Sequence, residues 1–135
     1  MNRIAIVQRG SNLKILLISG FGVLGTLARY FLQGAVQDRT GAGFPYGTLA
    51  VNLTACLALG AVGQYALQHI SFPADWRNAI TIGFFGAYST FSTFSYETIR
   101  MLEEGDWARA AAYLTTSIVG GLAAVWLGMR AGSAL

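Results

Sequence analysis

Four apolar stretches, each close to the length of a membrane span, constrain this chain more than any other feature. They lie at about residues 15–31, 47–68, 78–99 and 108–129. A helix that crosses a bilayer needs roughly 20 mostly apolar residues, because each residue adds about 1.5 Å and the hydrocarbon layer is about 30 Å thick. Pro45 and Pro73 fall between the stretches, where residues that break helices belong. The sequence therefore predicts an all-α membrane protein with four transmembrane helices.

The composition excludes the other broad classes of protein. Only 11% of the residues are charged and 54% are hydrophobic, whereas a soluble domain carries about 25% charged residues. Cys56 is the only cysteine, which excludes a scaffold held together by disulfides within the chain. We expect a single transmembrane domain over residues 1–135, whose first apolar run is too long for a cleaved signal peptide. The net charge of +3 is spread along the chain and does not suggest a nucleic-acid partner.

The positive charges give almost no orientation signal. With four spans, one side of the membrane would carry five of them, namely Arg3, Arg9, Lys14, Arg77 and Arg130. The other side would carry four, namely Arg29, Arg39, Arg100 and Arg109. Because positive residues normally concentrate on the cytoplasmic side, so small a bias favours insertion in both directions and an antiparallel, dual-topology homodimer. Two alternatives stay open: an arginine deep in the first helix is wrongly counted, or another factor sets the orientation.

The third stretch carries six hydroxyl side chains at a depth that should be hydrocarbon. They are Ser89, Thr90, Ser92, Thr93, Ser95 and Thr98. Polar groups at that depth need partners or a water-filled cavity. Each hydroxyl could simply bond back to a carbonyl one turn earlier, which would bend the helix. So many hydroxyls after two glycines favour instead a broken third helix whose freed carbonyls line a site.

Candidate side chains for an ion path lie on three of the stretches. Phe91 and Phe94 are three residues apart and project from one helix face, and the positive edges of their rings could stabilise an anion. Asn52 lies within an apolar run, four residues after Thr48, and its amide could donate to an anion. Thr115, Thr116 and Ser117 add hydroxyls from the fourth stretch. The alternatives are core packing for the rings and a helix-to-helix hydrogen bond for the amide.

Ionisable residues lie near the predicted helix ends. Arg29 closes the first stretch, where it could draw anions toward a pore mouth or could merely snorkel to the interface. Glu97 and Arg100 are spaced for an ordinary helical ion pair. His69 and Cys56 have no partners at metal-ligand spacing. No nucleophile, base and orienting group occur together, so we do not expect an enzyme.

Three motifs resemble the CrcB/Fluc family of fluoride channels. They are GTLARY at 25–30, GTLAVN at 47–52 and GAYSTFSTFSYET at 86–98. The resemblance spans all four stretches. It implies a passive, fluoride-selective channel in the inner (plasma) membrane, which crosses the membrane several times and works as an antiparallel homodimer with two pores. Such a channel lets the cell lose fluoride that entered as the neutral acid and so relieves fluoride toxicity.

The resemblance also assigns residues. Its fluoride pathway falls on Asn52, Phe91, Phe94, Thr48, Thr93, Tyr113, Ser117, Arg29 and Glu97. It further implies a structural sodium ion, held by the backbone carbonyls of Gly86 and Ser89 in the break of the third helix. The chain departs from the family at Gly86-Ala87 and Ser89-Thr90, where the family usually has Gly-Gly and Thr-Thr, and at Gly121, where it often has serine. The first change matters little for carbonyl ligands, but the second removes a hydroxyl from the polar track.

Two rival functions stay open from the sequence. A small proton-coupled multidrug exporter is also a short four-helix protein of dual topology, but it uses a carboxylate deep in its first helix. The first stretch here has none, and Glu97 lies late in the third. A non-transporting assembly subunit would use the same polar groups only to hold helices together.

Overall fold

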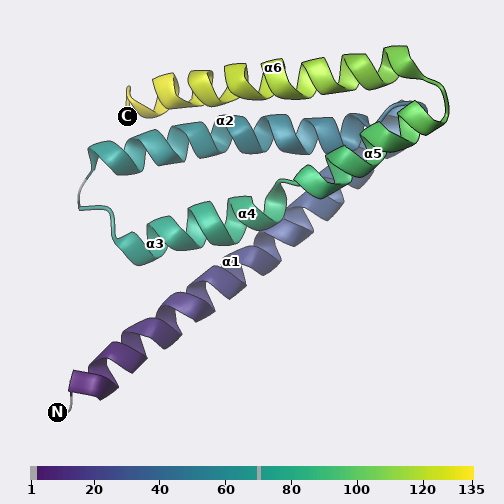
Figure 1. Ribbon diagram of the computed structural model, residues 1–135. Coiled ribbons are helices and arrows are strands. Elements are labelled where there is room, and N and C mark those ends of the chain that lie inside the picture. Colours follow the sequence, from purple (N-terminus) through teal and green to yellow (C-terminus); the bar gives the residue numbers. More distant parts are fainter. Residues whose placement is uncertain (1–2, 70) are drawn as a thin grey trace.

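The computed structural model describes residues 3–69 and 71–135, and these ranges contain only helices and their connections (Figure 1). The elements are α1 (Arg3–Thr40), α2 (Tyr46–Gln68), α3 (Ala74–Asn78), the π-helix η1 (Ala79–Phe84), α4 (Phe85–Tyr88), α5 (Phe91–Glu103) and α6 (Trp107–Gly132). The prediction of an all-helical protein is confirmed.

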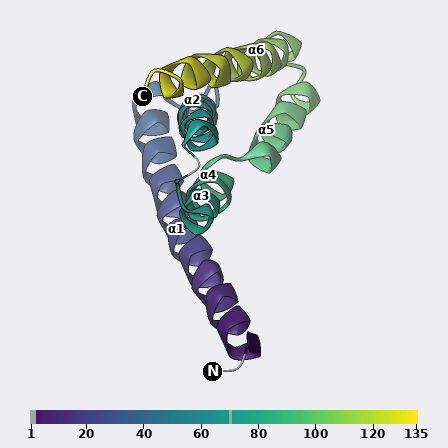
Figure 2. The same ribbon diagram turned by 90° about the vertical axis from the view of Figure 1, so that its left-hand side faces the viewer.

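The chain runs back and forth, so that the start of α1 and the end of α6 lie toward the same end of the molecule (Figure 1). In both views α6 lies alongside α2 (Figure 1 and Figure 2). Figure 2 also shows α3 and α4 against α1, whereas α5 stands apart from α1 and lies nearer α6. Within the described residues, three helical segments are long and apolar enough to cross a membrane: Asn12–Thr40, Tyr46–Gln68 and Trp107–Gly132.

The third apolar stretch does not form one helix. α4 ends at Tyr88, and Ser89 and Thr90 both have extended backbone before α5 begins at Phe91. The turns before α4 form the π-helix η1, which is wider than an α-helix. This interruption is the reason that no helix of spanning length covers residues 78–99.

The first helix is longer than its apolar stretch. We expected a span over about 15–31 with Arg29 at its end, but α1 continues to Thr40. The polar residues after the stretch are compatible with a helix, and the first strong stop is Gly41, whose φ of +80° favours glycine. Arg29 therefore lies inside α1 rather than at its end. The predictions for the second and fourth stretches agree with α2 and α6 to within a few residues.

Asp75 and Asp106 precede the third and fourth apolar stretches, where the sequence predicts that each caps a helix, and one of them does so. Asp106 precedes α6 and its side chain accepts the Arg109 backbone N–H at 3.2 Å, as an N-cap should. The prediction for Asp75 is wrong, because Pro73 occupies the N-cap of α3. Asp75 instead lies in the first turn, where its carboxylate is 3.5 Å from Lys14 Nζ.

Small residues allow α2 and α6 to approach closely. A side chain at Gly60 would collide with the Val125 carbonyl, and one at Gly128 would collide with the backbone of Leu57 and Ala61. Two repeats of small residues at every fourth position predict close helix packing: Gly120, Ala124 and Gly128 in α6, and Ala50, Thr54 and Ala58 in α2. Ala58, from the corresponding repeat in α2, packs instead toward the core formed with α4.

We predict that Gly128→Ala destabilises the protein by about 1–3 kcal/mol, because the new Cβ would overlap backbone that cannot rotate away. The thermal unfolding midpoint of the purified protein in detergent measures this effect. Gly34→Ala is the matched control, since nothing lies within 4 Å of a Cβ at that helical glycine. Equal midpoints for the two variants would contradict the close α2–α6 contact.

Two clusters of buried side chains join the helices on either side of the interruption to their neighbours. The first contains Val51, Ala55, Phe85 and Tyr88, and joins α2 to α4. The second contains Met101, Ala110 and Tyr113, and joins α5 to α6. The interruption at Ser89 and Thr90 falls between the helices that carry these clusters.

Candidate functional site

Asn52 binds the backbone at the interruption. Its Nδ2 donates to the Thr90 carbonyl at 3.1 Å, and its Oδ1 accepts the Thr90 N–H at 2.9 Å. In a continuous helix that N–H would bond to the Gly86 carbonyl. A primary amide carries one donor group and one acceptor on neighbouring atoms, so Asn52 supplies the acceptor that the Thr90 N–H lacks at the interruption and also donates to the Thr90 carbonyl.

Thr90 is also the N-cap of α5. Its hydroxyl accepts the Thr93 N–H at 3.3 Å and donates to Thr93 Oγ1 at 2.8 Å. Thr93, a predicted pathway residue, therefore lies next to the interruption. The sequence predicted Thr90 only as one of six hydroxyls at membrane depth, although threonine is a favoured N-cap residue.

A carboxylate with two hydroxyl partners lies between α2, α5 and α6. Thr48 Oγ1 donates to Glu97 Oε1 at 2.8 Å, and the Tyr113 hydroxyl donates to Glu97 Oε2 at 2.7 Å. Thr48 and Tyr113 are both 0% exposed. Three predicted pathway residues from three separate helices therefore meet in one network, which we call the carboxylate network.

The expected pair between Glu97 and Arg100 does not form. Arg100 Nη2 is instead 2.8 Å from Glu104 Oε1, one turn further along the chain. Glu97 is drawn toward the buried hydroxyl groups because its neighbours on α2 and α6 supply donors there. This prediction is wrong. Neutral hydroxyl groups, and not an arginine, hold the Glu97 carboxylate.

The two phenylalanines lie side by side, as their spacing predicts. The ring centroids of Phe91 and Phe94 are 5.8 Å apart with an angle of 48° between the planes. Phe94 also packs 5.1 Å from the Tyr113 ring and contributes to the second buried cluster. Phe91 is 79% exposed, so one ring is partly packed while the other is open.

Ser117 carries a buried hydroxyl without a partner. Its Oγ has no hydrogen bond to any residue in the described ranges, although it follows Tyr113 by one turn of α6. One turn further, Gly121 supplies no hydroxyl, and the position its Cβ would take is 3.5 Å from Cys56 Sγ. Along α6, the predicted polar track therefore has one hydroxyl without a partner, at Ser117. One turn further, the Cys56 thiol of α2 takes the place of a second hydroxyl.

Three of the remaining hydroxyls follow the simpler alternative. Ser89 donates to the Phe85 carbonyl at 3.0 Å, Ser95 to Phe91 at 2.9 Å and Thr98 to Phe94 at 2.8 Å. Each of these hydroxyls bonds to the carbonyl four residues earlier, Ser89 from the end of α4 and the other two within α5.

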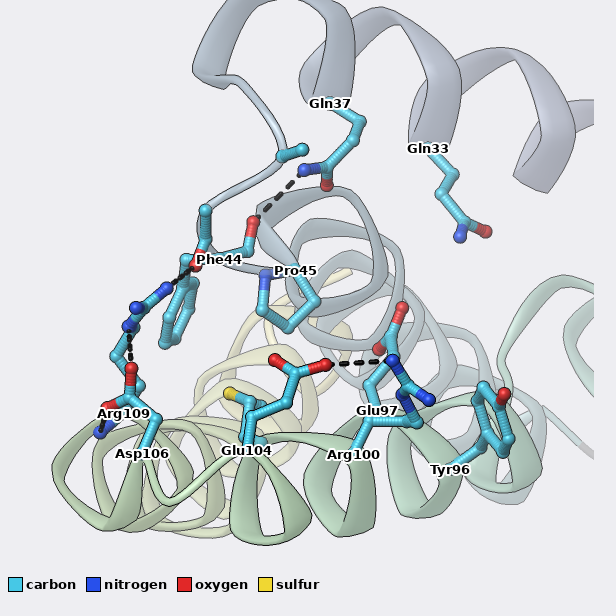
Figure 3. A pocket seen from close by; sticks show the side chains of 13 residues that line it. Gln33, Gln37, Phe44, Pro45, Tyr96, Glu97, Arg100, Glu104, Asp106 and Arg109 are labelled. Atoms are coloured by element: carbon cyan, nitrogen blue, oxygen red, sulfur yellow. Dashed lines mark hydrogen bonds and ion pairs between the residues drawn. The ribbon is translucent and has the colours of Figure 1, made fainter.

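A polar cavity of about 320 Å³ opens beside the carboxylate network (Figure 3). Glu97 lies in its wall, and ion pairs between Arg100 and Glu104 and between Arg109 and Asp106 surround it. Arg29, which we expected at a mouth, is half-buried within α1 and does not line this cavity. The arginines that do line it are Arg100 and Arg109.

Sequence reasoning missed Gln33 and Gln37, which also line the cavity. They lie beyond the predicted end of the first span, and hydropathy alone gives no reason to continue the helix to them. Their spacing of four residues, which places both on one helix face, was the available signal. Gln37 binds the connection to α2 by donating to the Phe44 carbonyl at 3.1 Å and accepting the Gly47 N–H at 3.1 Å.

The fold and this site define a small helical membrane protein with a polar network between its helices. Within the described ranges, no three His, Cys, Asp or Glu side chains gather as a metal site would require. The family model described as "CrcB-like protein, Camphor Resistance (CrcB)" matches residues 16–129, and the chain belongs to this family. The resemblance seen in the motifs is thereby confirmed.

Several relatives match almost over their whole length. A protein of Geobacter metallireducens is 46% identical over 117 residues, which is 87% of this chain and 94% of the relative. A protein of Acidobacterium capsulatum is 43% identical over 121 residues, or 90% and 97% of the two chains. One from Geobacter sp. strain M21 is 43% identical over 122 residues, or 90% and 98%. All three bear the name "Fluoride-specific ion channel FluC".

Proposed function

We propose that this protein is a fluoride-selective ion channel that passively exports fluoride across the cell membrane and relieves fluoride toxicity. The observation that carries the proposal is the match, over about nine-tenths of the chain, to relatives named as fluoride-specific channels. It is a channel and not an enzyme. No energy source is needed, because a membrane potential that is negative inside drives anions outward.

The chemistry of the site suits a small, strongly hydrated anion. A selective pore must replace the water around fluoride with donors in a narrow passage. Here the donors are neutral: the Asn52 amide, the hydroxyls of Thr48, Thr93, Tyr113 and Ser117, and the edges of Phe91 and Phe94. The buried, unpartnered Ser117 Oγ is a donor that a permeating ion could use at no cost to an existing hydrogen bond.

We propose four membrane crossings, the third broken at Ser89 and Thr90, and an antiparallel dimer of dual topology. The alternating directions of the chain in Figure 1 support the four crossings. Nearly balanced positive charge supports insertion both ways. The high exposure of Phe91 also supports a dimer, because a second copy would cover this ring and close a passage beside it.

We further propose a structural sodium ion at the interruption. The residues fit such an ion, because the Thr90 N–H bonds to Asn52 and so leaves the Gly86 carbonyl without its helical donor. Hard cations prefer oxygen ligands of this kind. The carbonyls of Gly86 and Ser89 would hold the ion, whose charge would neutralise their dipoles and hold the two ends of the break together.

The cell inner membrane is the proposed location, with lipid around the apolar helices. The multidrug-exporter alternative is not favoured. Its essential carboxylate has no counterpart in the first apolar stretch, and both oxygens of Glu97 are engaged by hydroxyl groups. Arg29 keeps its proposed role of attracting anions, from a position within α1.

Release of fluoride from sealed vesicles tests the function. The purified protein is reconstituted into liposomes loaded with potassium fluoride, and valinomycin starts the release, which a fluoride electrode records. We expect fast release that does not depend on a proton gradient, and no comparable release of chloride. Silence would favour an assembly subunit, and proton-coupled export of a cationic dye would favour the exporter.

A further inference from the structure

Gln33 reaches the carboxylate network from a fourth helix. Its Nε2 donates to Thr48 Oγ1 at 3.3 Å. Gly47 allows this approach, because a Cβ there would lie only 2.5 Å from the Gln33 carbonyl oxygen. In Figure 3 the Gln33 side chain extends from α1 into the cavity that Glu97 also lines.

The donors and acceptors in this network allow only one direction. An amide NH₂ group can only donate, and an ionised carboxylate can only accept. Thr48 accepts from Gln33 and has a single hydrogen of its own, so that hydrogen points to Glu97 Oε1. Thr48 is fully buried, so water does not offer its hydroxyl a different partner.

We propose that Gln33 is a positioning residue of the ion path, which acts by keeping the Thr48 hydrogen directed toward the interior. This inference rests on the proposed channel function. With Gln33 in place, Thr48 presents a hydrogen to Glu97 or to a passing anion, and never a lone pair. Without that donor, the Thr48 hydroxyl can turn its hydrogen toward a backbone carbonyl one turn earlier, as threonine hydroxyls in helices do. Its oxygen would then face the anion and repel it.

The charges that face Gln33 come from every side of the cavity. Glu97 and Arg100 belong to α5, Glu104 is the C-cap of that helix, and Asp106 and Arg109 lie at the start of α6. The arginines are each paired with a carboxylate, whereas Glu97 is held by hydroxyls. A second carboxylate at position 33 would be separated from Glu97 only by the Thr48 hydroxyl, and its ionised form would be costly near that like charge.

Gln33→Glu converts the position into a donor that depends on pH. When protonated, the introduced carboxyl can donate to Thr48 as the amide does; when ionised, it accepts and reverses the Thr48 hydroxyl. We expect this variant to release fluoride about tenfold more slowly than wild type at pH 7.5, because the path loses one hydrogen bond. At acid pH, where the carboxyl is protonated, release should be largely restored. Gln33→Met, which has similar length but no donor, should be slow at both pH values.

Release is measured from vesicles at about pH 5.5 and pH 7.5, after subtraction of release from protein-free vesicles at the same pH, because fluoride leaks as the neutral acid. Gln68→Glu, at the exposed end of α2, is the matched control and should follow the wild type. Release by Gln33→Glu that matches wild type at pH 7.5, or wild-type release by Gln33→Met, would overturn the inference. If Gln33→Glu does not reconstitute, Gln33→Met decides alone. Absence of release from the wild type would instead count against the proposed function.

Discussion

Replacing Asn52 with aspartate is expected to lower fluoride release by more than about 100-fold. Aspartate can still accept the Thr90 N–H, but it cannot donate to the Thr90 carbonyl as Asn52 Nδ2 does. It also adds a negative charge beside the proposed path. Repulsion between two unit charges about 4 Å apart is about 4 kcal/mol at an effective dielectric of about 20, which alone exceeds a 100-fold effect.

The matched control for this variant is Asn78→Asp at the end of α3, which makes the same chemical change away from the interruption. It should release fluoride at the wild-type rate. The vesicle assay with the fluoride electrode compares the two variants. Rapid release by Asn52→Asp would show that this amide does not lie beside the path.

Phe91→Ile is the second substitution with a large expected effect. Isoleucine fills a similar space but lacks the positive ring edge that could stabilise an anion, so fluoride release should fall by at least about tenfold. Because Phe91 is 79% exposed in the single chain, its removal should leave the folding of each chain intact. Size-exclusion profiles in detergent, recorded beside the release assay, separate loss of transport from loss of protein.

Phe31→Ile controls for the loss of an exposed ring. Phe31 lies on α1 and is 66% exposed, and its ring packs against Tyr30 rather than against the site. Its variant should keep wild-type release. If Phe91→Ile and Phe31→Ile release fluoride equally fast, Phe91 serves as a surface that contacts lipid and not as part of the path.

Local patterns in the sequence predicted the elements that depend only on neighbouring residues. Hydropathy located α2 and α6, and the spacing of Phe91 and Phe94 placed their rings together. The cluster of hydroxyls indicated an interruption, although the π-helix before it could not be foreseen. Hydropathy failed at the end of α1, because the helix continues through polar residues that bind the next connection, as Gln37 does.

The carboxylate network lay beyond prediction from local patterns. Thr48, Glu97 and Tyr113 were each candidates, but their meeting depends on the register of three helices packed together. Spacing within one helix instead favoured a pair between Glu97 and Arg100, because buried hydroxyl donors on other helices leave no trace in the local sequence. Gln33 was missed for the same reason, since its partner lies on another helix.

Whether this protein is a passive fluoride channel is tested by an electrical recording of the purified protein in a planar bilayer, with fluoride and chloride gradients imposed separately. A passive fluoride path predicts currents that reverse at the fluoride equilibrium potential and do not move with the chloride gradient. Currents that follow chloride or protons, or no current from protein that is well folded, would contradict the account.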